Sequence, residues 1–193
     1  MKQLPVITLR AMEPEDLEVL YTIENDRSLW DMGTSNVPYS RYSLRDYIVH
    51  ASNDIYVDRQ VRLVIENSEH QVVGLADLAN FDPQHLRAEL GLVVLRQYQR
   101  RGYAEAAVVQ VLDKARHILH LHQLYVIIVQ RNEAALQIFR KYCFIAGRTL
   151  KDWLFDGKKY HDASFFLRIL KLYFIKVWWF QKFSLPLHPL NKK

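Results

Sequence analysis

The sequence predicts a mixed α/β protein, in which a mostly antiparallel sheet carries helices on both faces. Two helix-like segments, residues 102–119 and 132–142, interrupt a series of short strand-like segments. Only the crossovers through these two helices, 102–119 and 132–142, can join parallel strands, so most of the strands are expected to pair antiparallel. An Asp-Gly turn at residues 156–157 adds a hairpin after the last helix.

Hydrophobic spacing and turn residues place the remaining elements. Strands are expected at residues 6–10, 61–66, 72–81, 86–95 and 124–129, and in a hairpin over 153–166. Helices are expected at residues 14–25, 42–51, 102–119 and 132–142, with a loop over 28–40. Pro14 suits a first helical turn, and Asn132 is a good helix N-cap. The run 124–129 is apolar throughout, which is typical of a buried, parallel strand.

The amino-acid composition limits the classes of protein to which this chain can belong. The 193 residues are half apolar and a quarter charged, as in a soluble globular domain. Cys143 is the single cysteine, which excludes an internal disulfide and a cysteine zinc site, and it is expected to be a small core residue. The first ten residues lack the apolar stretch of a secretion signal, so a cytoplasmic protein is expected. The glycines fit neither a dinucleotide-binding fingerprint nor a P-loop.

The positive charge is concentrated in the tail. Six basic residues and no acid follow position 167, which leaves residues 1–167 at −1 of the total of +5. No nucleic-acid partner is therefore expected for the domain. The expected division is a domain over 1–170 and a basic aromatic tail over 171–193. We expect this tail to pack on its own domain or on another subunit of a homo-oligomer, or else to make a weak contact with a membrane surface.

One segment suggests chemistry. An apolar strand ends in a basic turn, and the turn opens the long helix: Gln99, Arg100, Arg101, Gly102, Tyr103 and Ala104. The first amides of a helix lack internal partners and carry positive potential, so a pyrophosphate would fit there. The six residues alone also fit an ordinary strand-to-helix turn with solvated arginines.

The turn resembles the Q/R-x-x-G-x-G/A acetyl-CoA signature of the GNAT acetyltransferases, and the order of elements over residues 6–168 is similar too. Within that family the chain looks most like spermidine N-acetyltransferases and ribosomal-protein N-terminal acetyltransferases. The supporting segments are residues 85–90, 132–141 and 155–160. The resemblance implies a GNAT-like fold, whose sheet is splayed at its centre between the strands 86–95 and 124–130.

The resemblance also implies a reaction and a binding site. The implied enzyme transfers the acetyl group of acetyl-CoA, a co-substrate used without a metal, to a primary amine such as that of the polyamine spermidine. Acetylation of protein N-terminal amines and a catalytically weak or inactive CoA-binding module are the alternatives. The implied cofactor-binding residues are Leu92, Val93, Val94, the turn from Gln99 to Ala104, Asn132, Ala135 and Phe139.

The attacking amine must lose a proton, because alkyl amines are almost fully protonated near neutral pH. Glu89, on the strand before the turn, is the expected acceptor, directly or through water. It fits equally a salt bridge with a neighbour such as Arg87, or a charge that orients the substrate. Asp77 on the neighbouring strand is a weaker candidate.

Two departures from the family bear on activity. The family commonly carries a tyrosine acid on the last helix, and Phe139 stands at the matching position. Tyr142, one turn later, is the candidate acid, or else a packed tyrosine; without an acid, the thiolate leaves with help from water. No acid occurs at 35–39, and Asn80 stands where the polyamine subfamily tends to carry glutamate. The acids that could still line the site are Glu24, Asp26, Asp31, Asp77 and Glu89.

Overall fold

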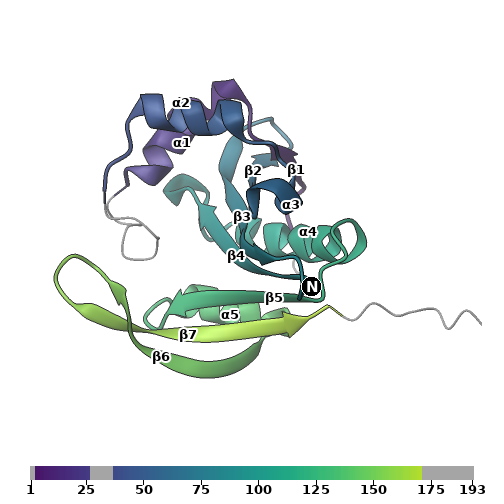
Figure 1. Ribbon diagram of the computed structural model, residues 1–193, viewed down its shortest axis with the longest axis vertical. Coiled ribbons are helices and arrows are strands. Elements are labelled where there is room, and N and C mark those ends of the chain that lie inside the picture. The colour runs from purple at the N-terminus through teal and green to yellow at the C-terminus, as the bar shows by residue number, and fades with distance from the viewer. Residues whose placement is uncertain (1–2, 27–36, 171–193) are drawn as a thin grey trace, which may run out of the picture.

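A seven-stranded sheet with the order β1-β2-β3-β4-β5-β7-β6 organises the chain (Figure 1). The computed structural model describes residues 3–26 and 37–170. The strands are β1 (Ile7–Ala11), β2 (Val61–Asn67), β3 (Val72–Asp82), β4 (Arg87–Val94), β5 (Gln123–Val129), β6 (Ile145–Phe155) and β7 (Tyr160–Ile169). The helices are α1 (Leu17–Glu24), α2 (Arg41–His50), α3 (Ile55–Asp58), α4 (Tyr103–His117) and α5 (Glu133–Lys141), with 3₁₀ turns at Pro14–Asp16 and Arg96–Tyr98.

Helices cover both faces of this sheet, and Val64 and Ile65 show why. These neighbours in β2 point to opposite faces, and both are fully buried. Val64 packs in a cluster with residues of α1 and α2, whereas Ile65 packs in a cluster with residues of α4 and α5. All pairings but one in the sheet are antiparallel, so the predicted fold class is confirmed.

The exception lies at the centre of the sheet, between β4 and β5. These strands are parallel, and their pairing runs only from Arg87 opposite Gln123 to Glu89 opposite Tyr125. On its other edge β5 pairs with β7 along its whole length. After Glu89 the two halves of the sheet therefore diverge, as the space between β4 and β5 in Figure 1 indicates. The prediction of a parallel strand at 124–129 holds only for the start of β5.

The structure differs from the expected elements in three other respects. β6 begins at Ile145 rather than near residue 153, and most of its residues are exposed. α3 was not expected; Asp54 caps it by accepting a hydrogen bond from the Tyr56 amide at 2.8 Å. The crossover through α5 leads to β6, but β7 lies between β5 and β6, so it joins no neighbouring parallel pair.

Cys143 is exposed rather than part of the core. It follows the last turn of α5 with a φ of 59°, and the next residue, Phe144, takes the buried place. The expected tail 171–193, with its contact to a membrane or another subunit, lies outside the described residues, as does most of the expected loop 28–40. None of the described helices is long and apolar enough to cross a membrane.

Candidate active site

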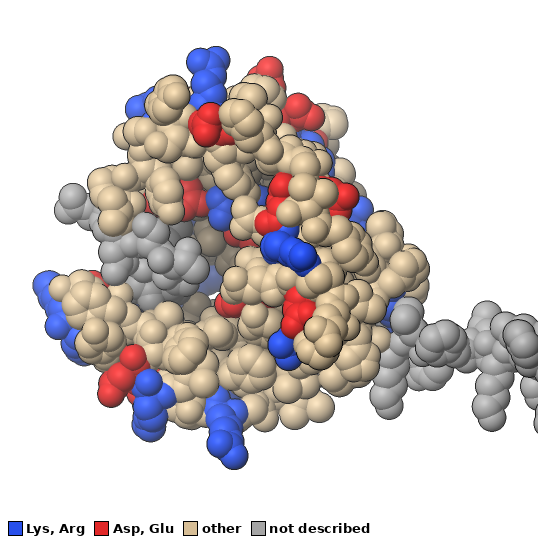
Figure 2. Space-filling model, in the orientation of Figure 1, with Lys and Arg blue, Asp and Glu red and all other residues tan. Residues whose placement is uncertain are grey.

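A cleft of about 570 Å³ occupies the place where β4 and β5 separate. Figure 2 shows the same face of the molecule hollowed between the two halves, with acidic and basic side chains interspersed around it. Ten of the residues expected at the site line the cleft: Glu24, Asp77, Glu89, Leu92, Val93, Val94, Gln99, Asn132, Ala135 and Phe139. Asp26 is not among the cleft residues, and Asp31 lies outside the described residues. Residues that were singled out in β4, in α5 and in the turn after β4 thus lie around one cleft.

The edge of β4 that faces the cleft is an open strand edge. The amide of Leu95 donates to the carbonyl of Val73 at 2.9 Å, so the main-chain groups of residue 95 point toward β3. Main-chain directions alternate along a strand, so those of Leu92 and Val94 point the other way, toward the gap left by β5. The main-chain groups of Val93 point to β3, opposite Leu75, so Val93 lines the cleft without offering main-chain partners to it. Gln99 donates from Nε2 to the Val94 carbonyl at 3.0 Å.

The turn before α4 leaves the first amides of this helix without a capping side chain. Gly102 is the N-cap with a φ of 93°, and no side chain in the described part of the chain caps the helix there, whereas Ser40, Asp54 and Asn132 cap α2, α3 and α5. Glycine is required by this backbone angle. A Cβ atom at Gly102 would also come within 3.0 Å of Pro5 Cδ, so crowding by the protein itself adds to the requirement.

The turn residues Arg100, Arg101, Gly102, Tyr103 and Ala104 are not among the residues that line the cleft. The guanidinium of Arg101 lies over the ring of Tyr98, 5.7 Å from its centre, and Tyr98 packs edge-on against Tyr103. These contacts fix the turn beyond the end of β4. The turn and the cleft are connected through Gln99, which belongs to both.

Glu89 is the last residue of β4 that pairs with β5, where it lies opposite Tyr125. Its Oε2 accepts a hydrogen bond of 2.8 Å from Nδ2 of Asn80. The expected alternative, an ion pair with Arg87, does not form, because Arg87 donates to Asp82 at 3.0 Å. The pKa of Tyr125 is raised, first by burial and then by the negative charge of Glu89.

The two aromatic residues proposed for the acid position face different surroundings. Phe139 is 5% exposed, lines the cleft and packs edge-on against Phe144. Tyr142 is not among the cleft residues; its hydroxyl donates to Oε2 of Glu105 on α4 at 3.2 Å. Burial, followed by the charge of Glu105, raises the pKa of Tyr142. The structure thus brings Phe139, and not Tyr142, together with the other candidate residues.

A splayed sheet, an open strand edge and an uncapped helix after it suggest a comparison with known families. The profile of the acetyltransferase (GNAT) domain matches residues 7–145. The chain belongs to the GNAT acetyltransferase family.

Curated relatives and solved structures agree with this assignment. The spermidine N(1)-acetyltransferase of Escherichia coli K12 is 27% identical over 162 residues, which cover 81% of this chain and 82% of the relative. The putative ribosomal N-acetyltransferase YdaF of Bacillus subtilis is 25% identical, covering 83% and 89%. The Vibrio cholerae spermidine N-acetyltransferase in complex with CoA and spermine has a TM-score of 0.74 at 24% identity, covering 85% and 95%, and so shares the fold.

One wall of the cleft in this GNAT domain holds an ion network that sequence analysis missed. Arg62 on β2 lies directly opposite Asp77 on β3, and donates to its two carboxylate oxygens at 2.8 and 3.0 Å. The same guanidinium donates to Glu24 on α1 at 2.5 Å. Burial lowers the pKa of Arg62, but the nearby carboxylates of Asp77 and Glu24 outweigh this effect and raise it above its usual value.

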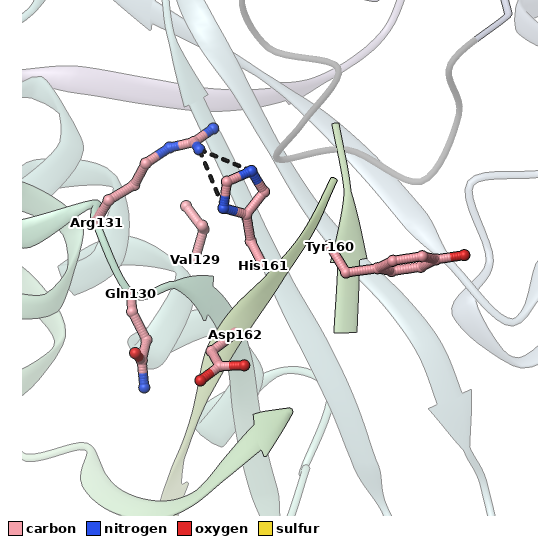
Figure 3. Close-up of a pocket in the computed structure, with 6 residues that line it drawn as sticks. All are labelled: Val129, Gln130, Arg131, Tyr160, His161 and Asp162. Carbon is pink, nitrogen blue, oxygen red and sulfur yellow. Dashed lines mark hydrogen bonds between the residues drawn. The ribbon is translucent and has the colours of Figure 1, made fainter. Parts of the chain in front are cut away.

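A smaller pocket of about 320 Å³ adjoins the cleft and shares Val129 with it. Figure 3 shows Arg131 reaching toward the ring of His161, with Nη1 lying 3.2 and 3.4 Å from the two ring nitrogens, while Tyr160 points away. Nε2 of His161 lies 2.6 Å from Oδ2 of Asp156. Hydrogen bonds from His161, and then from the hairpin amides, hold the pKa of Asp156 well below its usual range. This network stabilises the turn of the β6–β7 hairpin.

Replacing Arg62 with glutamine leaves Glu24 and Asp77 without their shared cation. The side chain of Arg62 is 25% exposed, so the two carboxylates that lose this cation are only partly solvated. We expect Arg62→Gln to lower the free energy of unfolding by about 2–3 kcal/mol. Arg41→Gln is the matched control, because Arg41 binds Glu18 by two hydrogen bonds but is 54% exposed, and it should cost less than about 1 kcal/mol. Urea unfolding of the two variants measures both values, and equal losses would contradict the structural role given to Arg62.

Proposed function

We propose that this chain is an acetyl-CoA-dependent N-acetyltransferase that acetylates a small cationic amine. The divergence of β4 and β5 carries the proposal, since it leaves the main-chain groups of Leu92 and the amide of Val94 on an open strand edge within the cleft. An extended ligand with amide groups, such as the pantetheine arm of coenzyme A, pairs with such an edge as a further strand would. Membership of the GNAT family supports acetyl transfer.

The described residues fit the rest of acetyl-CoA. The uncapped N-terminus of α4 offers the amides of residues 101–104 to the pyrophosphate, and Arg100 and Arg101 add positive charge. Asn132, Ala135 and Phe139 form the opposite wall of the cleft. Acetyl-CoA, when bound, supplies the activated acetyl group as a thioester.

The charge of the cleft supports a cationic acceptor. The described residues of its lining carry three carboxylates, those of Glu24, Asp77 and Glu89, and one guanidinium, that of Arg62, which gives these residues a net charge of −2. Negative potential in a cleft attracts ammonium groups and raises their local concentration. The names of the relatives from Escherichia coli and Vibrio cholerae point to spermidine and spermine. The proposed acceptor is therefore a polyamine such as spermidine.

Glu89 is the proposed proton acceptor for the attacking amine. Its carboxylate faces the cleft and is held through one oxygen by Asn80. Both carboxylate oxygens of Asp77 accept hydrogen bonds from Arg62, which makes Asp77 less suited to accept a proton. Removing the ammonium proton leaves the neutral amine, which is the nucleophilic form.

Phe139 favours a second candidate function. Its ring has no proton to give to a departing thiolate, so the chain would bind CoA and acetylate slowly or not at all. Protein N-terminal amines are the alternative acceptors, in line with the name of YdaF. A homo-oligomer and a membrane contact through residues 171–193 stay predictions from the sequence.

A panel of acceptors separates these functions. We expect spermidine and spermine to release free thiol from acetyl-CoA faster than N-terminal peptides or small neutral amino compounds, because they carry several ammonium groups. A colorimetric thiol assay measures the release, and calorimetry confirms that acetyl-CoA is bound. Turnover of peptides without turnover of spermidine would replace the proposed acceptor. Silence across the panel with acetyl-CoA bound would favour the binding module.

Gly102→Val tests the pyrophosphate site. A β-branched residue cannot easily hold a φ of 93°, so the first amides of α4 would turn away from the ligand. We expect acetyl-CoA binding to weaken by about 10–100-fold in calorimetry, as for one or two lost hydrogen bonds to a charged group. Gly157→Val is the control, because Gly157 has a φ of 89° in the hairpin turn, outside the site. Equal affinities of the two variants would show that the turn does not hold phosphate.

Phe139→Tyr tests proton delivery to sulfur. The new hydroxyl would lie within the cleft, and a positioned acid is worth about 10²–10⁴ in rate. We expect a gain in kcat of at least about tenfold, given partial alignment. Tyr142→Phe should leave kcat nearly unchanged, because the Tyr142 hydroxyl is engaged by Glu105. The reverse pattern in steady-state kinetics would make Tyr142 the acid.

A further inference from the structure

The edge of β3 next to Glu89 is interrupted by a bulge. Ala79 pairs with Glu89 and Asp82 pairs with Arg87, so Asn80 and Phe81 together face the single residue Ala88. Asn80 has a φ of 51°, in the left-handed region that few residues other than glycine adopt. Asparagine tolerates this conformation better than most side chains do. Bulges of this kind often lie beside active sites, where they redirect a side chain.

The neighbouring structure fixes this bulge. The Phe81 amide donates to the carbonyl of Arg59 at 3.0 Å, directly after α3. The Phe81 ring is 4% exposed and packs edge-on against Tyr56 of α3, with ring centres 5.0 Å apart. A backbone conformation that costs energy persists only where its surroundings determine it. Here, α3 supplies those surroundings.

The bulge changes the direction of the Asn80 side chain. Ala79 and Glu89 are directly opposite, so their side chains lie on the same face of the sheet. In a regular strand, residue 80 would point to the other face. The extra residue instead lets Nδ2 of Asn80 donate to Oε2 of Glu89 at 2.8 Å, and both residues line the cleft.

The charged neighbours of Glu89 are engaged elsewhere. On β4, Arg87 binds Asp82, and on the facing strands Arg62 binds Asp77 and Glu24. On β5, the neutral Tyr125 lies opposite Glu89 and stacks on Phe165, and its side chain interacts with those of both Glu89 and Asn80. Among these neighbours, Asn80 is the one that reaches Glu89 from the bulge, with a hydrogen bond of 2.8 Å to Oε2.

We propose that Asn80 is a positioning residue, which holds Glu89 through Oε2 and leaves its other oxygen, Oε1, to accept the proton of the substrate amine. The assignment rests on the proposed function. The proton moves from the amine nitrogen to Oε1 of Glu89, and the electron pair of the broken N–H bond stays on nitrogen as the nucleophilic lone pair. Asn80 itself neither gains nor loses a proton.

Asn80→Gly tests this role without straining the backbone, since glycine accepts a positive φ and only the amide is lost. We expect kcat with spermidine to fall about tenfold, as for one lost hydrogen bond to a charged group, while KM for acetyl-CoA changes less than about twofold. Asn80→Asp keeps the shape but sets a second carboxylate against Glu89, and should reduce kcat further. Asn53→Gly and Asn53→Asp are matched controls, because Asn53 has a φ of 56° outside the site.

A measurement that needs no turnover completes the test. The side-chain amide NMR signal of Asn80, assigned by its loss in Asn80→Gly, should move with pH as Glu89 titrates and stay fixed in Glu89→Gln. A signal that moves equally in Glu89→Gln overturns the assignment, and so does an Asn80→Gly variant with the kcat of Asn53→Gly. Absence of turnover by the wild-type protein with every amine overturns the proposed function, and with it the positioning role of Asn80.

Discussion

The site depends on the unequal hydrogen bonding of β5. This strand pairs with β7 from end to end but with β4 only as far as Glu89 opposite Tyr125. Main-chain donors and acceptors that are removed from water need hydrogen-bond partners. The edge of β4 beyond its pairing with β5 is therefore suited to bind a ligand through main-chain hydrogen bonds. The cleft, its open strand edge and the position of Glu89 at the branch point all follow from that one divergence.

Much of the fold was predictable because its helices have strong local signals. The spacing of apolar residues in α4 and the N-cap Asn132 of α5 each specify an element from a short stretch of sequence. β6 lacks such a signal because most of its residues are exposed, on both faces, so no alternation of apolar and polar residues marks its start at Ile145. α3 has only four residues, too few for a helical period to appear.

Site residues were predictable where a sequence motif and the order of the elements are enough to place them, as for Gln99 and Phe139, which line the cleft. Other site residues were not predictable, because the tertiary structure decides whether their groups face the cleft. The main-chain direction of Val93 depends on which residues of β3 and β4 exchange hydrogen bonds, and the sequence does not contain that information. Tyr142 follows Phe139 by three residues, but α5 ends at Lys141 and the chain turns, so the ring reaches α4 instead of the cleft.

The uncapped start of α4 also has a thermodynamic consequence. A helix without a capping side chain gives up about 1 kcal/mol that a serine or aspartate would contribute. A ligand that binds these amides and the edge of β4 replaces both missing partners, and it does so only in the folded state. At a ligand concentration of one hundred times Kd, such binding adds about 2.7 kcal/mol to the free energy of unfolding. The lifetime of the folded chain in a cell would then rise and fall with the supply of that ligand.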